Sequence, residues 1–253
     1  MTDVTLLSLL PDGVDVIGAG ILVLASFFTS ALTASAGVGG GLALLGLMTY
    51  IVPIAALIPV HGVVQLGSNA GRAVLMRAYI AWTCLLAFLL GALPGAVLGR
   101  FAVGLLPETA METLLGLFIL VLTWVRLPKM EGISGKGFAV TGFITTAMTM
   151  VFGATGPFNA VVLSKAFTER LTLVATMASV MTAQHLVKVI VFAIAGFAFA
   201  EWAPLLVAMM ATGFAGTWAG RHLLVKMSEE RFRLIFNIGL SLLALDLIRR
   251  GLS

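Results

Sequence analysis

Long apolar stretches with very few charges between them constrain this chain more than any other feature. Of its 253 residues, 60% are apolar and 10% are charged, whereas a soluble domain has about 25% charged residues. A soluble fold of this composition would expose large apolar patches to water. We therefore expect an all-α integral membrane protein. Since a helix needs about 20 apolar residues to cross the bilayer, the chain has room for about eight to ten membrane segments.

The few charged residues further narrow the classes of protein to which this chain can belong. The net charge is +4, but the Lys and Arg residues are scattered singly, which favours cytoplasmic loops and excludes a nucleic-acid partner. The N-terminus contains Asp3, Asp12 and Asp15 and no early Lys or Arg. Because a cleaved signal peptide begins with a positive region, we expect the first segment to be retained. The single cysteine, Cys84, excludes an intramolecular disulfide.

Glycine, proline and charged residues divide the chain into ten apolar stretches. The longest polar gap, residues 127–137, separates two nearly equal halves. We therefore expect a first transmembrane repeat over residues 1–126, a cytoplasmic linker over 127–136 and a second repeat over 137–253. The ten stretches run over residues 14–35, 38–51, 54–76, 79–101, 108–126, 137–152, 154–166, 170–198, 203–222 and 230–248.

A weak internal repeat relates the two halves. GAVLGR at residues 95–100 matches GTWAGR at 216–221, an offset of about 121 residues. Further matches occur in the same order at an offset of about 116, so one small insertion separates two blocks of matches. The alternative is that two glycine-rich apolar sequences align somewhere by chance. The pairs at the shorter offset are Gly37 with Gly153, Gly40 with Gly156, Asn69 with His185, and Arg72 with Lys188.

The placement of basic residues indicates that the repeat is inverted. Each half has five segments, an odd number, so the second half should enter the membrane from the opposite side. Lys and Arg stay on the cytoplasmic side, and with the N-terminus outside Arg249 and Arg250 disagree, because they end outside. Inverted repeats are typical of transporters, which bind their substrate between the halves near the midplane. The basic residues that agree are Arg72, Arg77, Arg126, Lys129, Lys136, Lys165, Arg170, Arg221, Lys226, Arg231 and Arg233.

Glycine clusters interrupt the apolar sequence at corresponding places in the two halves. They are ASAGVGGG at residues 34–41 and FGATGPFN at 152–159. Each glycine costs about 1 kcal/mol in a helix relative to alanine, and Pro157 kinks or starts a helix. We therefore expect a broken hairpin in each half, with short arms over 38–51 and 154–166 that meet near the midplane. Backbone of this kind is tolerated in a bilayer where it lines a wet cavity.

Helices that begin at mid-membrane would create an anion site. Their free N–H groups and the positive ends of their dipoles point into the cavity. Ser35, Thr155 and Asn159 could add side-chain donors. The alternative is close helix packing through small residues. The substrate-binding residues predicted from the two breaks are Gly37, Gly39, Gly40, Gly41, Gly153, Thr155, Gly156 and Asn159.

Two polar stripes supply further candidates. His61, Gln65, Ser68 and Arg72 are spaced by 4, 3 and 4 residues, which places them on one helical face. Such groups should face the interior of the bundle. Lys188 cannot easily snorkel to the surface, whereas Arg72 can. The stripes add His61, Gln65, Asn69, Arg72, Gln184, His185 and Lys188 to the predicted substrate-binding residues.

No carboxylate lies deep within a segment, so proton-coupled transport would use His61 and His185 as the titrating groups. The alternative for each histidine is a hydrogen-bonded packing role. Neither H-E-x-x-H nor G-x-S-x-G occurs in the sequence, which argues against a membrane enzyme. We expect no metal and no cofactor.

These motifs resemble the TauE/SafE family of sulfite and organosulfonate exporters. The resemblance lies in AGVGGG, GATGP, the polar and basic pair His185 and Lys188, and the repeated G-x-x-x-G-R motifs, and it covers nearly the whole chain. The family often has a proline soon after the first glycine cluster, where this chain has Leu44, Leu45 and Gly46. The resemblance implies a bacterial inner-membrane carrier for small sulfur-containing anions such as sulfite, thiosulfate or sulfoacetate, often proton-linked.

The sequence therefore favours a secondary transporter, an exporter that works by alternating access between the two halves. Its partners would be a small anion, the lipid bilayer and, if coupled, protons. The alternatives are an anion channel and a structural membrane subunit of a larger complex. The oligomeric state stays open.

Overall fold

The structure is a computed structural model that describes residues 10–36, 39–124, 133, 135–223 and 229–252. In this part of the chain all regular structure is helical, as predicted, and each of the ten predicted stretches overlaps one α-helix. The helices are α2 (Val16–Ala36), α3 (Gly40–Met48), α4 (Ile54–Leu75), α5 (Trp82–Leu105), α6 (Glu108–Trp124), α7 (Gly135–Phe152), α8 (Gly156–Ala166), α9 (Arg170–Ile194), α10 (Phe199–Leu223) and α11 (Glu229–Leu252), with a 3-10 turn, η1, at Arg77–Tyr79.

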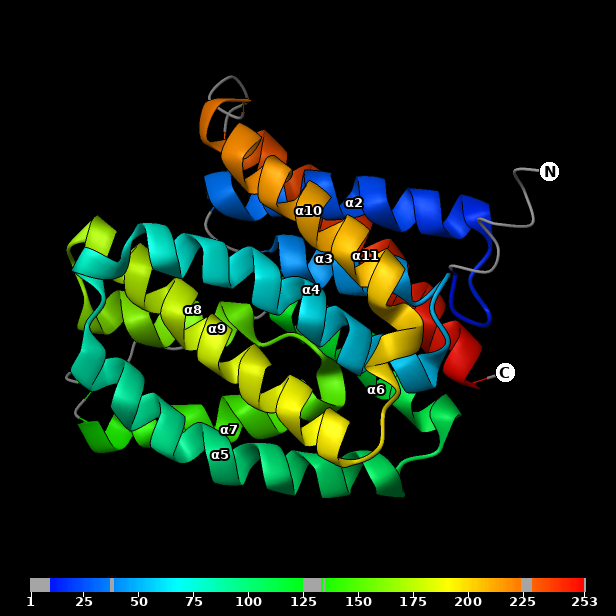
Figure 1. The fold of residues 1–253 in the computed structure, drawn as a ribbon, viewed down its shortest axis with the longest axis horizontal. Coiled ribbons are helices and arrows are strands. Elements are labelled where there is room, and N and C mark those ends of the chain that lie inside the picture. Colours follow the sequence, from blue (N-terminus) through cyan, green and yellow to red (C-terminus); the bar gives the residue numbers. More distant parts are fainter. Residues whose placement is uncertain (1–9, 37–38, 125–132, 134, 224–228, 253) are drawn as a thin grey trace.

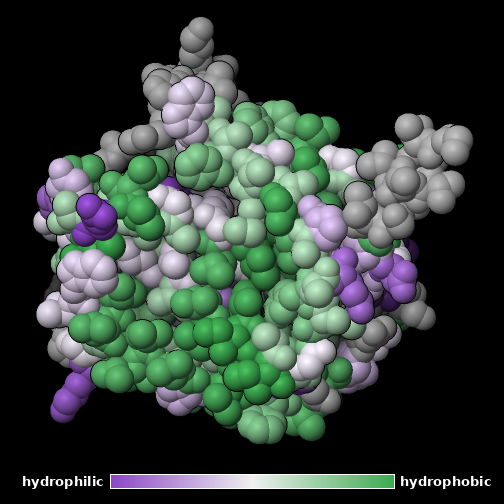
Figure 2. Space-filling view, in the orientation of Figure 1, coloured by the Kyte–Doolittle hydropathy of each residue, from purple (hydrophilic) through white to green (hydrophobic). Residues whose placement is uncertain are grey.

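Four of the described helices are long and apolar enough to cross a membrane, judged by length and composition: stretches of α2, α5, α9 and α10. Large apolar side chains such as Leu90 and Phe101 of α5 are more than two-thirds exposed. Figure 2 shows that apolar residues cover much of the face in view. Such a surface suits lipid rather than water, so the prediction of a membrane protein is confirmed.

The two glycine-flanked helices are much shorter than the bilayer. α3 has 9 residues and α8 has 11, so at 1.5 Å per residue they are about 14 and 16 Å long. The hydrocarbon core is about 30 Å thick. Each short helix therefore has one end inside the protein, as predicted for the arms of a broken hairpin.

The helices form pairs that each join the first half of the chain to the second. α2 packs on α10, α5 on α7, α6 on α11, and α4 on α9. In Figure 1, α2 and α10 lie along one edge of the molecule and α5 and α7 along the opposite edge. In the order of the two halves, α2 corresponds to α7, α4 to α9 and α5 to α10. If each helix is replaced by its counterpart, the α5–α7 pair becomes the α10–α2 pair, and the α4–α9 pair stays the same. This pattern supports an inverted repeat, which stays a prediction together with the domain boundaries. Most of the predicted linker lies outside the described residues.

The repeated G-x-x-x-G-R motifs perform the same structural role in both halves. A Cβ atom at Gly95 of α5 would overlap the carbonyl oxygen of Phe143 in α7, and one at Gly216 of α10 would overlap that of Phe27 in α2. Phe143 and Phe27 are themselves related by the 116-residue offset. Small residues let the helix backbones approach closely in a membrane. These contacts hold the outer helices against each other and leave α4 and α9 in the centre.

Candidate functional site

Both predicted helix breaks are present in the described residues. Gly39 precedes α3 with φ of 104°, and Gly153 lies between α7 and α8 with φ of 78°. Residues with a side chain rarely adopt such a backbone conformation, which explains why glycine stands at these two positions. Gly37 and the side chain of Ser35 lie outside the described residues.

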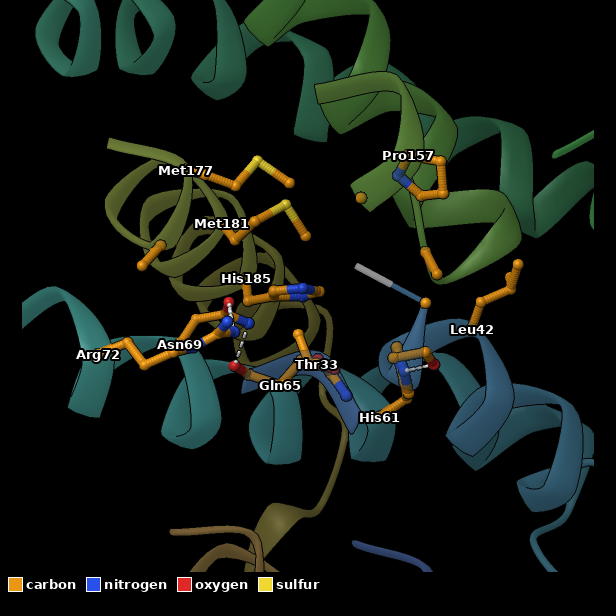
Figure 3. Close-up of a pocket in the computed structure, with 15 residues that line it drawn as sticks. Thr33, Leu42, His61, Gln65, Asn69, Arg72, Pro157, Met177, Met181 and His185 are labelled. Atoms are coloured by element: carbon orange, nitrogen blue, oxygen red, sulfur yellow. Dashed lines mark hydrogen bonds between the residues drawn. The ribbon is translucent and has the colours of Figure 1, made fainter. Parts of the chain in front are cut away.

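A small cavity lies where the two breaks meet the two polar stripes. Its volume is about 40 Å³, which exceeds what one water needs and is far below a drug-sized pocket. A ligand of few heavy atoms fits this volume. Figure 3 shows a row of α4 side chains facing a row from α9 across the cavity. The lining residues are Thr33, Gly39, Gly41, Leu42, His61, Gln65, Asn69, Arg72, Ala154, Gly156, Pro157, Met177, Ala178, Met181 and His185.

The N-terminal end of α3 forms one wall of the cavity. Gly39, Gly41 and Leu42 line it, and the first N–H groups of a helix have no partner within the helix. Gly40 does not line the cavity but lies against α2, where its missing side chain leaves room for the carbonyl group of Thr29. This close contact fixes the start of α3, so its amides and the positive end of its dipole face the cavity.

Two buried histidines face each other in the cavity wall. The ring centroids of His61 and His185 are 6.1 Å apart and the rings are nearly perpendicular. His61 Nε2 donates to the carbonyl oxygen of Gly41 at 2.8 Å, so Nε2 carries a proton. The Nδ1 atoms of both rings are buried and have no partner among the described residues. Each Nδ1 therefore keeps an unused hydrogen-bonding position, an acceptor in the neutral ring and a donor in the charged ring.

Arg72 is the cation of the cavity lining. Its Nη2 donates to Asn69 Oδ1 at 2.8 Å, and Asn69 Nδ2 donates to the carbonyl oxygen of Gln65 at 2.8 Å. The Nε of Arg72 is buried without a partner among the described residues. None of the lining residues is a carboxylate. The cavity therefore combines N–H donors with uncompensated positive charge, an environment suited to an anion.

Other predicted site residues form a hydrogen-bonded network behind the cavity. Gln184 Nε2 donates to the hydroxyls of Thr145 and Thr146, and its Oε1 accepts from Thr155 Oγ1 and Asn159 Nδ2, all at 3.2 Å. All of these side chains are buried. The network joins α7 and α9 to the start of α8, so it holds the second break in place.

Lys188 also lies behind the cavity lining. Its side chain is fully buried, and Nζ donates to the carbonyl oxygen of Gly153 at 2.9 Å and to Thr149 Oγ1 at 3.4 Å. These groups stand at the C-terminal end of α7, where the helix dipole is negative and attracts a cation. The ammonium group therefore supports the glycine break from behind.

The structure brings together eight of the fifteen predicted substrate-binding residues in the cavity lining. Gly40, Gly153, Thr155, Asn159, Gln184 and Lys188 lie outside the lining. Whether any of these residues binds substrate stays a prediction. The remaining lining residues were not predicted from the sequence: Thr33, Leu42, Ala154, Pro157, Met177, Ala178 and Met181. A signal existed for two of them, because Met177 and Met181 stand 116 residues after His61 and Gln65.

Comparison with known families gives one match. The model of the family described as "Sulfite exporter TauE/SafE" matches residues 22–247, which include every residue of the cavity lining. Neither the curated proteins nor the solved structures contain a match.

Proposed function

Because the chain belongs to the TauE/SafE sulfite exporter family, we propose that it is a secondary active transporter that exports small sulfur-containing anions. The family consists of membrane transporters rather than enzymes, and the apolar helices fit a protein of the membrane. The candidate substrates are sulfite, thiosulfate and small organosulfonates. Its location would be the bacterial inner membrane.

The observation that carries this proposal is the convergence of donors in one small cavity. The amide end of α3, the two histidines and Arg72 come from helices of both halves. Sulfur oxyanions present several oxygens around one centre, and such a group suits N–H donors that converge from different directions. The cavity volume of about 40 Å³ favours the smaller members of this class, sulfite and thiosulfate.

The tautomer of His61 supports a role for protons. Because its Nε2 proton is donated to Gly41, the neutral ring offers only a lone pair at Nδ1. A lone pair repels an anion, so an oxyanion binds best when it brings a proton or when the ring is protonated. The proton would then be bound in the cavity while the anion is present.

The cavity lies between the two halves, which suits alternating access. Its walls come from α2, α3 and α4 of the first half and from α8 and α9 of the second. If the halves rock against each other around this point, the cavity opens first to one side of the membrane and then to the other.

Counterflow in proteoliposomes tests the proposal. Vesicles loaded with unlabelled sulfite should accumulate radiolabelled sulfite, because a carrier exchanges substrate across the membrane. Arg72→Gln should reduce the rate at least tenfold, since it removes the cation of the lining. Arg77→Gln is the matched control, because Arg77 is exposed and lies outside the cavity.

Two results would contradict the proposal. Labelled flux without stimulation by internal sulfite would indicate a channel. Full activity of both Arg72→Gln and Gly41→Leu would show that the cavity is not the transport site, because a leucine at position 41 would enter the space beside Gln65.

A further inference from the structure

The turn after α3 holds a polar cluster at the end of the bundle away from the cavity. We call it the Arg250 cluster, and it consists of Thr49, Tyr50, Glu112, Asp246 and Arg250. The guanidinium of Arg250 donates to the carbonyl oxygen of Thr49 at 3.2 Å and to its hydroxyl at 3.3 Å. It lies 4.8 Å from the ring centroid of Tyr50. The cluster therefore gathers residues from α6, α11 and the end of α3.

Acidic residues hold Arg250 in this position. The guanidinium lies 3.5 Å from Glu112 Oε1 and 3.4 Å from Asp246 Oδ2, and the three side chains are 22–28% exposed. Asp246 also accepts a hydrogen bond from the Tyr50 hydroxyl at 2.9 Å. Because these charges are partly removed from water, their attraction exceeds that of a pair at the open surface. Arg250 thus fixes the end of α3 to α6 and α11.

The same short helix forms the wall of the cavity at its other end. Thr49 is the C-cap of α3, so Arg250 places a positive charge at the negative end of the dipole. The nine residues of α3 span about 14 Å. A shift of α3 at the Arg250 cluster therefore changes the position of the amides that face the cavity.

An apolar layer separates the cavity from the Arg250 cluster. Leu44, Leu45 and Met48 of α3 and Leu57 and Ile58 of α4 are at most 2% exposed and belong to one buried cluster. Side chains buried this completely are closely packed and leave no path for an anion. The protein is therefore closed between the cavity and the Arg250 cluster.

The opposite direction is less tightly packed. α4 lines the cavity from His61 to Arg72, and α9 lines it from Met177 to His185. Arg72, Met177 and Thr33 are partly exposed. The cavity thus extends toward the C-terminal end of α4, where the exposed Arg77 follows, and basic residues of this kind mark the cytoplasmic side.

From this geometry we propose that Arg250 is a positioning residue that latches the outer gate of the transporter, and that the structure is the inward-facing state. Release of Thr49 by Arg250 lets α3 swing away from α4 and opens the apolar layer to the outside. This inference rests on the proposed function, because only a carrier needs a gate that alternates. The cluster also explains why Arg249 and Arg250 lie outside although Lys and Arg usually stay on the cytoplasmic side. Glu112 and Asp246 compensate their positive charges.

Cysteine accessibility tests the latch without any substrate. In a Cys84→Ala background, Ile58→Cys reports on the apolar layer and Met177→Cys on the opposite side of the cavity. A membrane-impermeant thiol reagent is added outside to measure the first reporter and inside to measure the second. Arg250→Gln should raise the labelling rate of Ile58→Cys about tenfold and lower that of Met177→Cys, because removing a charge-assisted contact shifts the population toward the outward-facing state.

Arg249→Gln is the matched control, since Arg249 is 70% exposed and, in the described part of the chain, forms its ion pair with Asp246 rather than with Glu112. It should leave both rates unchanged, and Arg250→Lys should restore part of the original ratio. The latch is refuted if Arg250→Gln leaves the rate of Ile58→Cys unchanged. It is equally refuted if both rates rise together with a lower melting temperature, because that result shows loosening of the fold.

Failure of the two proposals can be told apart. If the protein shows counterflow and Arg250→Gln leaves the labelling rates unchanged, the latch is refuted and the transporter proposal is supported. If Arg250→Gln changes the two labelling rates in opposite directions but the protein shows no counterflow of sulfite, the latch is supported and sulfite is refuted as the substrate.

Discussion

Replacing Gly40 with alanine tests how the start of α3 is positioned. A Cβ atom at this residue would overlap the carbonyl oxygen of Thr29 and lie 2.8 Å from its carbonyl carbon, whereas ordinary contact begins at 3.4 Å. The obstacle is helix backbone in α2, which cannot rotate aside as a flexible side chain would. The two helices must therefore separate by about 1.5 Å, at a cost of about 1–3 kcal/mol in the free energy of unfolding.

The displacement should also weaken anion binding. The amides of Gly41 and Leu42 would retreat from the cavity by a similar distance, enough to break a hydrogen bond to a bound oxyanion. Loss of one charge-assisted hydrogen bond costs about 1.5–3 kcal/mol, so the Kd for sulfite should rise about 10- to 100-fold. Titration calorimetry on the purified protein measures the Kd, and a melting curve without ligand measures the change in stability.

Gly20→Ala is the matched control, because a Cβ atom at this residue of α2 meets nothing within 4 Å. It should leave both the Kd and the melting temperature unchanged. The reasoning would be wrong if Gly40→Ala bound sulfite as tightly as the parent protein. A lower melting temperature with an unchanged Kd would show that the start of α3 supports the fold without contacting the anion.

Three further changes have distinct expected outcomes. Gly156→Ala should weaken sulfite binding and leave the melting temperature unchanged, because its Cβ atom would meet only Met181 Cε at 3.9 Å and would project into the cavity that Gly156 lines; calorimetry and a melting curve check this. Lys188→Met should lower the melting temperature and slow counterflow more than Lys188→Gln does, because only glutamine can still donate to Gly153 and an unpaired buried acceptor costs about 1–3 kcal/mol; equal effects of the two variants would contradict this role. Glu169 accepts hydrogen bonds from Thr172, and the bond from the hydroxyl, followed by the bond from the amide, holds the pKa of Glu169 below its ordinary value of 4.5. The stabilisation of α9 by the Glu169 carboxylate is therefore complete above pH 4.5 and is lost as the pH falls through the lowered pKa. Glu169→Gln should therefore melt below the parent at neutral pH and converge with it in acid, as measured by melting curves across the acid range.

The helices of this protein could be predicted closely because their signals are local. Apolar length and glycine breaks depend on neighbouring residues alone, and Gly39 and Gly153 stand where the backbone has positive φ. The two short helices followed from the same signal. Only their bounds shifted: the predicted arm over residues 38–51 became a helix from Gly40 to Met48.

The roles of individual site residues depended on tertiary contacts that the sequence does not display. Gly40 and Gly156 look equivalent in the repeat, yet only Gly40 lies against a neighbouring backbone. Lys188 was predicted to face the anion because it cannot snorkel, but an equally good partner existed in the carbonyl group of Gly153. Pattern alone could not choose between two partners inside the bundle.

The pairing of α2 with α10 has a consequence for how the protein is made. α2 ends at residue 36 and α10 begins at residue 199, so about 10 to 30 s of synthesis separates them at ordinary ribosome speeds. During this time the hydroxyl of Ser26 lacks its acceptor, the carbonyl oxygen of Met209, and the α2 surface that receives Gly216 faces lipid or the insertion machinery. A chaperone or insertase that shields this surface would therefore act on the first half of the chain until the ninth stretch, which forms α10, has entered the membrane.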